Sequence, residues 1–496
     1  MSAAPSPAVS PPEPRSRVAA RLAEALRHGA VITRSEELKP YECDGLSAYR
    51  ATPLAVAIPT SEEEVAAILK VARETSTPVV ARGSGTGLSG GALPLTDGIL
   101  MSMAKFNRIV HVDPLARQAR VQPGVTNLRI SQHVAPLGLY YAPDPSSQIA
   151  CSIGGNVAEN SGGVHCLKYG LTVHNILRVR AITIEGDAIE LGSEALDAPG
   201  YDLLALATGS EGLLAVTLEV TVKLLPKPEL AQVVMASFAD VESAGGAVAN
   251  VIGAGIVPAG LEMMDKLATR AVEDFVHAGY DLEAEAILLA ESDGTREEVE
   301  HEIAKISEVM RASGATDIRV SSNDAERLRF WSGRKAAFPA VGRISPDYYC
   351  IDGSIPRGAL SHVLKRTEEM SGKYGLRCAN VFHAGDGNLH PLILYDANVP
   401  GELHKTEEFA AELLELCIEV GGTITGEHGV GIEKINQMCS QFGSAELVQF
   451  HAVKAAFDPV GLLNPGKAVP TLHRCAEYGA MHVKAGQLPH PELPRF

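Results

Sequence analysis

The chain has 496 residues, of which 46% are hydrophobic, and it carries a formal net charge of −17 at pH 7. This length is too great for one ordinary core and is sufficient for two or three domains. The apolar content is that of a globular protein. The negative charge argues against binding to nucleic acids or to anionic membrane surfaces, and the sequence has no run of about 18 apolar residues that could span a membrane.

The N-terminal segment begins with a tail rich in proline, serine and alanine that lacks the apolar stretch of a secretory signal. We expect this tail to be disordered and the protein to be cytoplasmic. The cysteines contain no C-x-x-C pair, which excludes the usual ligand spacings of iron–sulfur clusters, zinc ribbons and c-type haem. Free thiols in a reducing compartment are the simplest interpretation of the eight cysteines, at positions 43, 151, 166, 350, 378, 417, 439 and 475.

A glycine-rich loop, ARGSGTGLSGG at residues 81–91, contains G-T-G-L-S-G, which matches the dinucleotide fingerprint G-x-G-x-x-G. Its context does not fit a Rossmann unit. A helix beginning near Ser61 and a short strand precede the loop, whereas Pro94 and Gly98 prevent a helix directly after it. Consecutive backbone N–H groups without side chains can still bind phosphate as an anion-binding nest. A plain glycine-rich surface turn is the alternative.

A second segment of small residues, 141–163, contains two Gly-Gly pairs beside Asn156 and Asn160. Such a backbone can lie against a flat ligand while the amides bond its edge. Further along, alternating apolar residues predict a strand with one apolar face. That face would carry Val216, Leu218, Val220 and Val222.

Two histidines, His383 and His390, stand on either side of a turn signal, Asp386-Gly387, in the segment HAGDGNLH. On one straight strand their odd spacing would place them on opposite faces. If the chain doubles back at the turn, the two side chains face one another across two strands. Histidines presented in this way are good ligands for a borderline metal ion.

A third candidate ligand, Glu427, lies in the segment TITGEHGVGIEK, after a helix predicted over residues 402–420. Gly426 and Gly429 permit a bend that brings Glu427 and its neighbour His428 into one pocket. Two histidines and one carboxylate form a three-ligand site with open positions, suited to zinc, manganese or iron. The alternative is that each histidine only satisfies a local backbone partner.

Three stretches, PVVARGSGTGLSGGALP, PDPSS…SIGGNVAENSGG…KYG and GSEGLLAVTLEVTVKL, resemble the FAD-binding domain of the vanillyl-alcohol oxidase/p-cresol methylhydroxylase family. The later motifs HAGDGNLH, GEHGVG and NPGK are similar to those of its 2-hydroxy-acid dehydrogenase branch, which includes the FAD subunit of bacterial glycolate oxidase and D-lactate dehydrogenase. The resemblance covers residues 50–470 and implies an α+β fold with two domains. These are a PCMH-type FAD-binding domain and an α+β, ferredoxin-like cap domain for the substrate.

We expect four segments along the chain. They are an N-terminal tail and helical segment (1–50), the FAD-binding domain (51–227), the substrate and cap domain with the metal site (228–455), and a C-terminal segment that returns to the FAD-binding domain (456–496).

By the same resemblance, the glycine loop holds the FAD pyrophosphate, and later segments line its adenine and isoalloxazine rings. Many members of the family attach FAD through a histidine in this loop, and bicovalent members also use a cysteine, whose matching position here is Gln148. Residues 83–91 contain no histidine, so we expect non-covalent FAD, with Cys151 and Cys166 as buried packing residues. The residues assigned to FAD are Gly83, Ser84, Gly85, Thr86, Gly87, Leu88, Pro143, Asp144, Ser147, Gly154, Gly155, Asn156, Asn160, Gly162, Val216 and Asn464.

The resemblance also assigns the metal to His383, His390 and Glu427. It makes Arg334 the ligand of the substrate carboxylate, which an arginine fork binds bidentately; a surface arginine on a helix is the alternative. We expect FAD-dependent oxidation of a small 2-hydroxy acid, glycolate or D-lactate, by hydride transfer to flavin N5. The metal would lower the pKa of the substrate hydroxyl, and His428 would act as general base.

Three other functions stay open. One is a D-2-hydroxyglutarate dehydrogenase, but such enzymes carry a lysine near the position of Cys350 and an asparagine near that of Leu392, and this chain lacks both. The others are a zinc hydrolase and a catalytically silent FAD-binding subunit. Because the sequence offers no onward electron carrier, we expect an iron–sulfur partner subunit, through which any membrane association would run.

Overall fold

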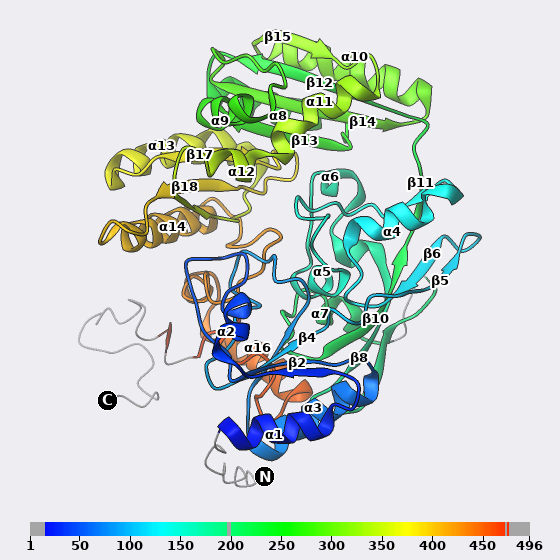
Figure 1. Ribbon diagram of the computed structural model, residues 1–496. Coiled ribbons are helices and arrows are strands. Elements are labelled where there is room, and N and C mark those ends of the chain that lie inside the picture. Colours follow the sequence, from blue (N-terminus) through cyan, green and yellow to red (C-terminus); the bar gives the residue numbers. More distant parts are fainter. Residues whose placement is uncertain (1–14, 196–199, 472–473, 476–496) are drawn as a thin grey trace.

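The computed structural model describes residues 15–195, 200–471 and 474–475. The expected proline-rich tail, up to residue 14, lies outside these residues, as does most of the chain after Pro470. Two domains are stacked, with the N-terminal domain below the cap domain in the orientation of Figure 1. Within the described part of the chain, no helix is long and apolar enough to traverse a lipid bilayer.

The first sheet of the N-terminal domain has four strands in the order β1-β2-β4-β3. Its elements are α1 (Arg15–Ala25), β1 (Ala30–Ile32), α2 (Ser35–Leu38), β2 (Ala55–Ile58), α3 (Glu62–Thr75), β3 (Val79–Arg82) and β4 (Ile99–Ser102). Helix α3 begins where predicted, because the Ser61 side chain accepts a hydrogen bond from the backbone N–H of Glu64. The glycine loop leads from β3 to β4 without a helix, which confirms that the loop is not part of a Rossmann unit.

The second sheet of this domain has five strands in the order β5-β6-β10-β8-β9. The strands are β5 (Ile109–Asp113), β6 (Gln118–Val121), β8 (Ile176–Ile182), β9 (Ala188–Gly192) and β10 (Val216–Lys223). The remaining elements are α4 (Asn127–Val134), β7 (Leu139–Tyr140), α5 (Ile153–Glu159), α6 (Cys166–Tyr169), α7 (Leu203–Ala207) and β11 (Leu225–Pro226).

Strand β10 confirms the predicted strand but not its single apolar face. Its register against β8 shifts between Thr217 and Glu219, which is a β-bulge. Val216 and Leu218 therefore pack into the core cluster that contains α3. Beyond the bulge, Val220 and Val222 pack into a different cluster, with α4. The prediction of one shared face is wrong because alternation in sequence cannot reveal a bulge.

The cap domain is built on a seven-stranded sheet in the order β15-β12-β14-β13-β17-β18-β16. The strands are β12 (Leu230–Phe238), β13 (Gly260–Asp265), β14 (Ala286–Gly294), β15 (Ala315–Val320), β16 (Asp347–Cys350), β17 (Cys378–Phe382) and β18 (Pro391–Tyr395). Every pair of neighbours in it is antiparallel. Its first four strands and their helices give the ferredoxin-like arrangement expected for the cap, with α9 as an added helix.

Helices cover both faces of the cap sheet. They are α8 (Val241–Gly253), α9 (Lys266–Val276), α10 (Arg296–Ala312), α11 (Asp324–Lys335), α12 (Ala337–Val341), α13 (Leu360–Tyr374) and α14 (Glu402–Glu419). One core cluster joins the sheet to α8, α10, α13 and α14. Another joins its opposite face to α9, α11 and α12. Helix α9, strand β14 and helix α10 follow one another along the chain.

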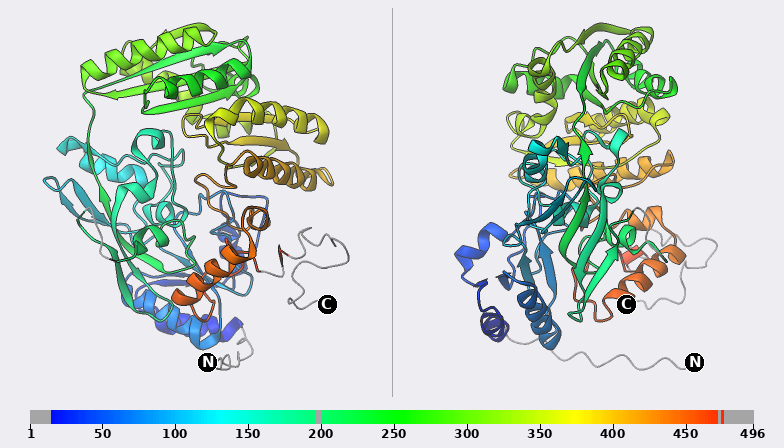
Figure 2. Two further views of the ribbon diagram at one scale, coloured as in Figure 1. Left: turned by 180° about the vertical axis from the view of Figure 1, so that it is seen from behind. Right: turned by 90° about the vertical axis from the view of Figure 1, so that its right-hand side faces the viewer.

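After α14 the chain returns to the N-terminal domain. Helices α15 (Met438–Gln441) and α16 (Ser444–Phe457) lead away from the cap, and α16 lies beside the N-terminal domain in both views of Figure 2. Leu463 then forms a parallel bridge with Val79 of β3. One expectation is wrong here, because Cys439 and Cys475 form a disulfide across a separation of 36 residues that short-range spacing could not reveal. The other six cysteines are free thiols.

Candidate functional site

The glycine loop borders a cavity of about 350 Å³ that extends from the N-terminal domain to the cap domain. Gly85 has a φ of 70°, which lets the loop turn tightly over the cavity. Of the residues assigned to FAD from sequence, those that line the cavity are Gly83, Ser84, Gly85, Thr86, Gly87, Leu88, Ser147, Gly154, Gly155, Asn156 and Val216.

The other assigned residues support the wall without lining it. The Pro143 carbonyl accepts a hydrogen bond from Asn127, and the Asn160 side chain accepts one from the backbone N–H of Val173. Asn464 donates to the carbonyl oxygens of Gly91 and Glu211, so it ties the C-terminal segment to the glycine loop. Asp144 binds His165 instead of facing the cavity.

Gly162 plays a part that the sequence did not indicate. Its backbone N–H donates to Glu427 Oε2 at 2.9 Å. A Cβ at this position would lie 2.6 Å from the same oxygen, so only glycine allows the approach. Gly162 therefore positions a candidate metal ligand.

His383, His390 and Glu427 meet at the end of the cavity nearest the cap. The chain turns between β17 and β18 as predicted, with a bridge between His383 and Asn388. Glu427 Oε1 lies 3.2 Å from His383 Nε2 and 3.0 Å from His390 Nε2. The three ligand atoms all lie within 4.8 Å of one another, which fits one divalent cation. Both histidines and the carboxylate are almost fully buried.

Glu262 and Arg334 form a buried ion pair next to His383. Glu262 on β13 receives a hydrogen bond from His383 Nδ1 at 2.7 Å and one from Arg334 Nε at 2.6 Å. Burial would raise the pKa of Glu262, but His383 and Arg334 together lower it. The carboxylate directs Nε2 of His383 toward Glu427, as partners of metal-binding histidines do.

Arg334 is only 1% exposed, which rules out the surface arginine considered from sequence. One of its terminal nitrogens lies 3.5 Å from His383 Nδ1. The residue does not line the cavity; the neighbouring Lys335 does.

Asp352, which the sequence did not single out, organises the loop that carries Glu427 and His428. It lies just after β16 and accepts hydrogen bonds from the backbone N–H groups of residues 426–428. The Lys434 ammonium donates to it at 3.0 Å. Burial alone would raise the pKa of Asp352, but Lys434, His428 and His390 hold it well below its usual value.

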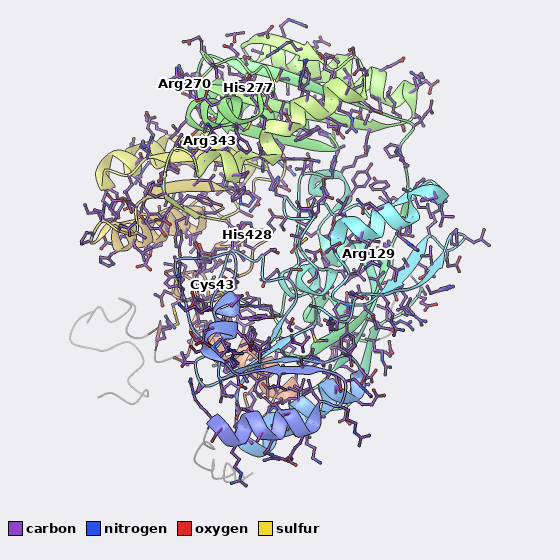
Figure 3. The ribbon with its side chains drawn as sticks, in the orientation of Figure 1. Cys43, Arg129, Arg270, His277, Arg343 and His428 are labelled. Atoms are coloured by element: carbon purple, nitrogen blue, oxygen red, sulfur yellow. A yellow bond between two sulfur atoms is a disulfide. The ribbon has the colours of Figure 1, made fainter. Side chains whose placement is uncertain are left out.

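His428 lines the cavity, and in Figure 3 it lies between the two domains. Its ring stacks on that of His390, with centroids 4.8 Å apart. Its Nδ1 is buried and has no hydrogen-bond partner among the described residues. Burial lowers the pKa of His428 to about 4, with His390 adding to the effect although Asp352 opposes it. The pKa of about 4 favours a neutral ring at pH 7, with one nitrogen that lacks a hydrogen-bond partner among the described residues.

Two family models and a full-length relative agree on the family. Residues 53–192 match the family described as FAD binding domain, and residues 227–468 match the FAD linked oxidases, C-terminal domain. Glycolate oxidase subunit GlcD of Escherichia coli K12 is 63% identical over 482 residues, or 97% of each chain. The chain belongs to the FAD-linked oxidases.

Other FAD-linked oxidases are more distant in sequence. The GlcD subunit of Bacillus subtilis is 37% identical over 86% of this chain and 91% of its own. The D-lactate dehydrogenase of Archaeoglobus fulgidus is 34% identical over 84% of this chain and 91% of its own. The structure of p-cresol methylhydroxylase with substrate bound has a TM-score of 0.77 at 17% identity, covering 92% of this chain and 97% of that one. This likeness shows the two-domain fold.

The cavity fits the FAD of this family, since backbone from the glycine loop lines it and a buried carboxyl oxygen of Glu159 on its wall lacks a partner among the described residues.

Proposed function

We propose that this FAD-dependent hydroxy-acid oxidase oxidises a small 2-hydroxy acid, glycolate or D-lactate, to the 2-oxo acid. The observation that carries the proposal is that His390, Glu427 and His428 line the same cavity as the glycine loop. A candidate cation-binding site and a candidate base would thus adjoin the place proposed for FAD.

His428 is proposed as the general base. Its unpartnered Nδ1 can accept the proton of the substrate hydroxyl, and the stacked ring of His390 holds its plane. Bound FAD supplies a hydride acceptor, its N5, for the hydrogen at C2 of the acid. A zinc, manganese or iron ion on His383, His390 and Glu427 would supply Lewis acidity that lowers the pKa of the substrate hydroxyl.

The substrate carboxylate needs a cation. The family resemblance points to Arg334, which lies beside His383 but pairs with Glu262. We retain Arg334 as the residue that orients the acid, with Lys335 on the cavity wall as the alternative.

We propose that the substrate is a small acid and not a 2-hydroxyglutarate. Cys350 and Leu392 are paired across β16 and β18 and are both buried. They provide neither charge nor amide for a second carboxylate, which a 2-hydroxyglutarate would carry.

Anaerobic titration tests the function directly. The purified protein should show a flavin spectrum that glycolate or D-lactate bleaches, whereas L-lactate and both 2-hydroxyglutarates bleach it less. A flavin that no hydroxy acid bleaches would indicate a silent FAD-binding subunit. A protein without flavin that hydrolyses esters or amides would indicate the zinc hydrolase.

Electrons must leave the reduced flavin, and we propose that an iron–sulfur partner subunit accepts them. The E. coli relative is named as a subunit of glycolate oxidase, and the sequence here lacks cluster-binding cysteine spacings. Purification from the native host, followed by iron and sulfide assay, should recover such a partner. Rapid hydroxy-acid-dependent oxygen uptake by the isolated chain would contradict this.

A further inference from the structure

Glu159, the last residue of α5, lines the cavity next to the loop that carries His428. Its Oε2 is buried and has no hydrogen-bond partner among the described residues. Its carboxyl group approaches two glycines from different domains. A Cβ on Gly91 of the glycine loop would lie 2.7 Å from Glu159 Oε1, and one on Gly429 would collide with Oε2.

A second carboxyl group, that of Glu211, crowds the same place. The same Cβ atoms on Gly91 and Gly429 would lie 3.3 Å and 3.0 Å from the oxygens of Glu211. Glu211 accepts hydrogen bonds from the backbone N–H groups of Val430 and Gly431, at 2.7 and 2.8 Å. Burial raises the pKa of Glu211, but these donors lower it. Of the two carboxyl groups, Glu159 is therefore the one whose neutral form is favoured more.

The nearby lysines are engaged elsewhere. Lys434 donates to Asp352 and to the Gly429 carbonyl, and Lys467 donates to the carbonyl oxygens of Gly91 and Leu93. Burial is the largest cause that raises the pKa of Glu159 well above its usual value, and the charges of Glu211 and Asp44 add to it, although both lysines oppose it. The neutral form is therefore favoured for a carboxyl group that lines the cavity.

His428 marks the end of the cavity where oxidation takes place, and Gly429 is its neighbour in the chain. The ring of FAD has to approach this end to receive a hydride. We propose that Glu159 donates a hydrogen bond from its neutral carboxyl group to the flavin ring and thereby favours flavin reduction. Reduction adds negative charge to the ring, so a neutral donor stabilises the product where a carboxylate would oppose it.

The inference rests on FAD binding, which family membership supports, and on the proposed location of the oxidation. Its test needs no hydroxy acid. The role of Glu159 can therefore be refuted while the proposed substrate is confirmed, and the proposed substrate can be refuted while the role of Glu159 is confirmed. The midpoint potential of the bound flavin is measured by chemical reduction in the parent, Glu159→Gln, Glu159→Ala and the control Glu190→Gln. Glu190 is an exposed carboxylate on β9 of the same domain.

Glu159→Ala should lower the equilibrium constant for two-electron reduction at least tenfold, which corresponds to a potential about 30 mV more negative. Glu159→Gln keeps a neutral donor and should lie close to the parent, as should Glu190→Gln. Infrared difference spectra on flavin reduction should show a carboxylic-acid C=O band that is lost in Glu159→Gln. An unchanged potential in FAD-loaded Glu159→Ala would overturn the proposal. So would retention of the C=O band in Glu159→Gln.

Discussion

Asp352 and Lys434 form an ion pair of 3.0 Å in which both side chains are fully buried. The pair has a structural role, since the Asp352 carboxylate also accepts hydrogen bonds from the backbone N–H groups of residues 426–428. The position of Glu427 and His428 at the cavity therefore depends on a carboxylate located 75 residues or more earlier in the chain.

Removal of one partner of this pair should be more harmful than removal of both. Asp352→Asn removes the nearer charge partner of the buried Lys434 ammonium and leaves only the Glu433 carboxyl group, at 3.5 Å. We expect it to lower the free energy of unfolding by about 3–5 kcal/mol. Lys434→Met combined with Asp352→Asn should recover part of that loss. Chemical denaturation of the variants measures this. As a control, Glu369→Gln, which breaks an exposed pair with Arg366, should cost less than about 1 kcal/mol. If Asp352→Asn and Glu369→Gln lowered the free energy of unfolding equally, the structural role of the buried pair would be contradicted.

The metal ligands should be separable from FAD binding. His383→Ala and His390→Ala each remove one of three ligand atoms, so we expect loss of bound metal and of turnover, with an unchanged flavin spectrum. Metal analysis of the purified variants measures this. His404→Ala alters an exposed histidine on α14 and should keep both metal and turnover. Full metal content in either test variant would mean that the ion lies elsewhere.

Arg334→Lys should raise KM for the hydroxy acid and lower kcat. An ammonium cannot replace a planar guanidinium that bonds Glu262 and also reaches His383. Steady-state kinetics with the metal-loaded protein measure both constants. Lys335→Gln serves as the comparison at the neighbouring position. A larger rise in KM for Lys335→Gln than for Arg334→Lys would assign the carboxylate to Lys335.

FAD should be released by acid. The glycine loop has no histidine, and Cys151 on the cavity wall is a poor nucleophile because burial raises the pKa of its thiol, although Asn156 and Ser147 oppose this. Precipitation with trichloroacetic acid should leave the yellow colour in the supernatant. Colour that stays in the pellet, and is lost in Cys151→Ser, would show attachment at that cysteine.

The contact between the domains should be sensitive to pH through His165. Its ring lies between Asp144 of the N-terminal domain and Glu291 of the cap, at 2.9 and 3.3 Å. Burial would lower the pKa of His165, but the two carboxylates raise it well above its usual value.

Because the pKa of His165 is higher in the folded protein, its stabilising effect is fully present below about pH 6.5 and is lost as pH rises through the folded value. The difference in melting temperature between the parent and His165→Gln should therefore be largest in acid and shrink in alkali. The exposed His111→Gln on β5 is the control. A difference that grows with pH would contradict the assignment.

Local patterns predicted much of this molecule. The capped helix α3, the glycine loop after β3 and the turn between His383 and His390 depend on residues close together in the chain, so propensity and turn chemistry were sufficient. The same holds for the bend at residues 426–429. The ferredoxin-like cap followed from the resemblance of its motifs to a known family.

Contacts between distant residues could not be predicted in this way. Asp352, Glu262 and Glu159 act through partners more than 70 residues away or in the other domain. Asp352 and Glu262 stand in unremarkable local sequences, and Glu159 lies within the second segment of small residues without having been singled out. The signal that could have found them is a lone acidic residue within or beside an apolar strand or helix, since a buried carboxylate needs a partner.

The C-terminal segment completes the wall beside the glycine loop. Asn464 donates to the carbonyl of Gly91 across 373 residues of chain, and Leu463 pairs with Val79. During synthesis at about 5–20 residues per second, roughly 20–75 s therefore pass between synthesis of the glycine loop and synthesis of the C-terminal segment that contacts it. A nascent chain would hold an incomplete cofactor site for all of that time, so FAD loading in the cell should follow synthesis of this segment.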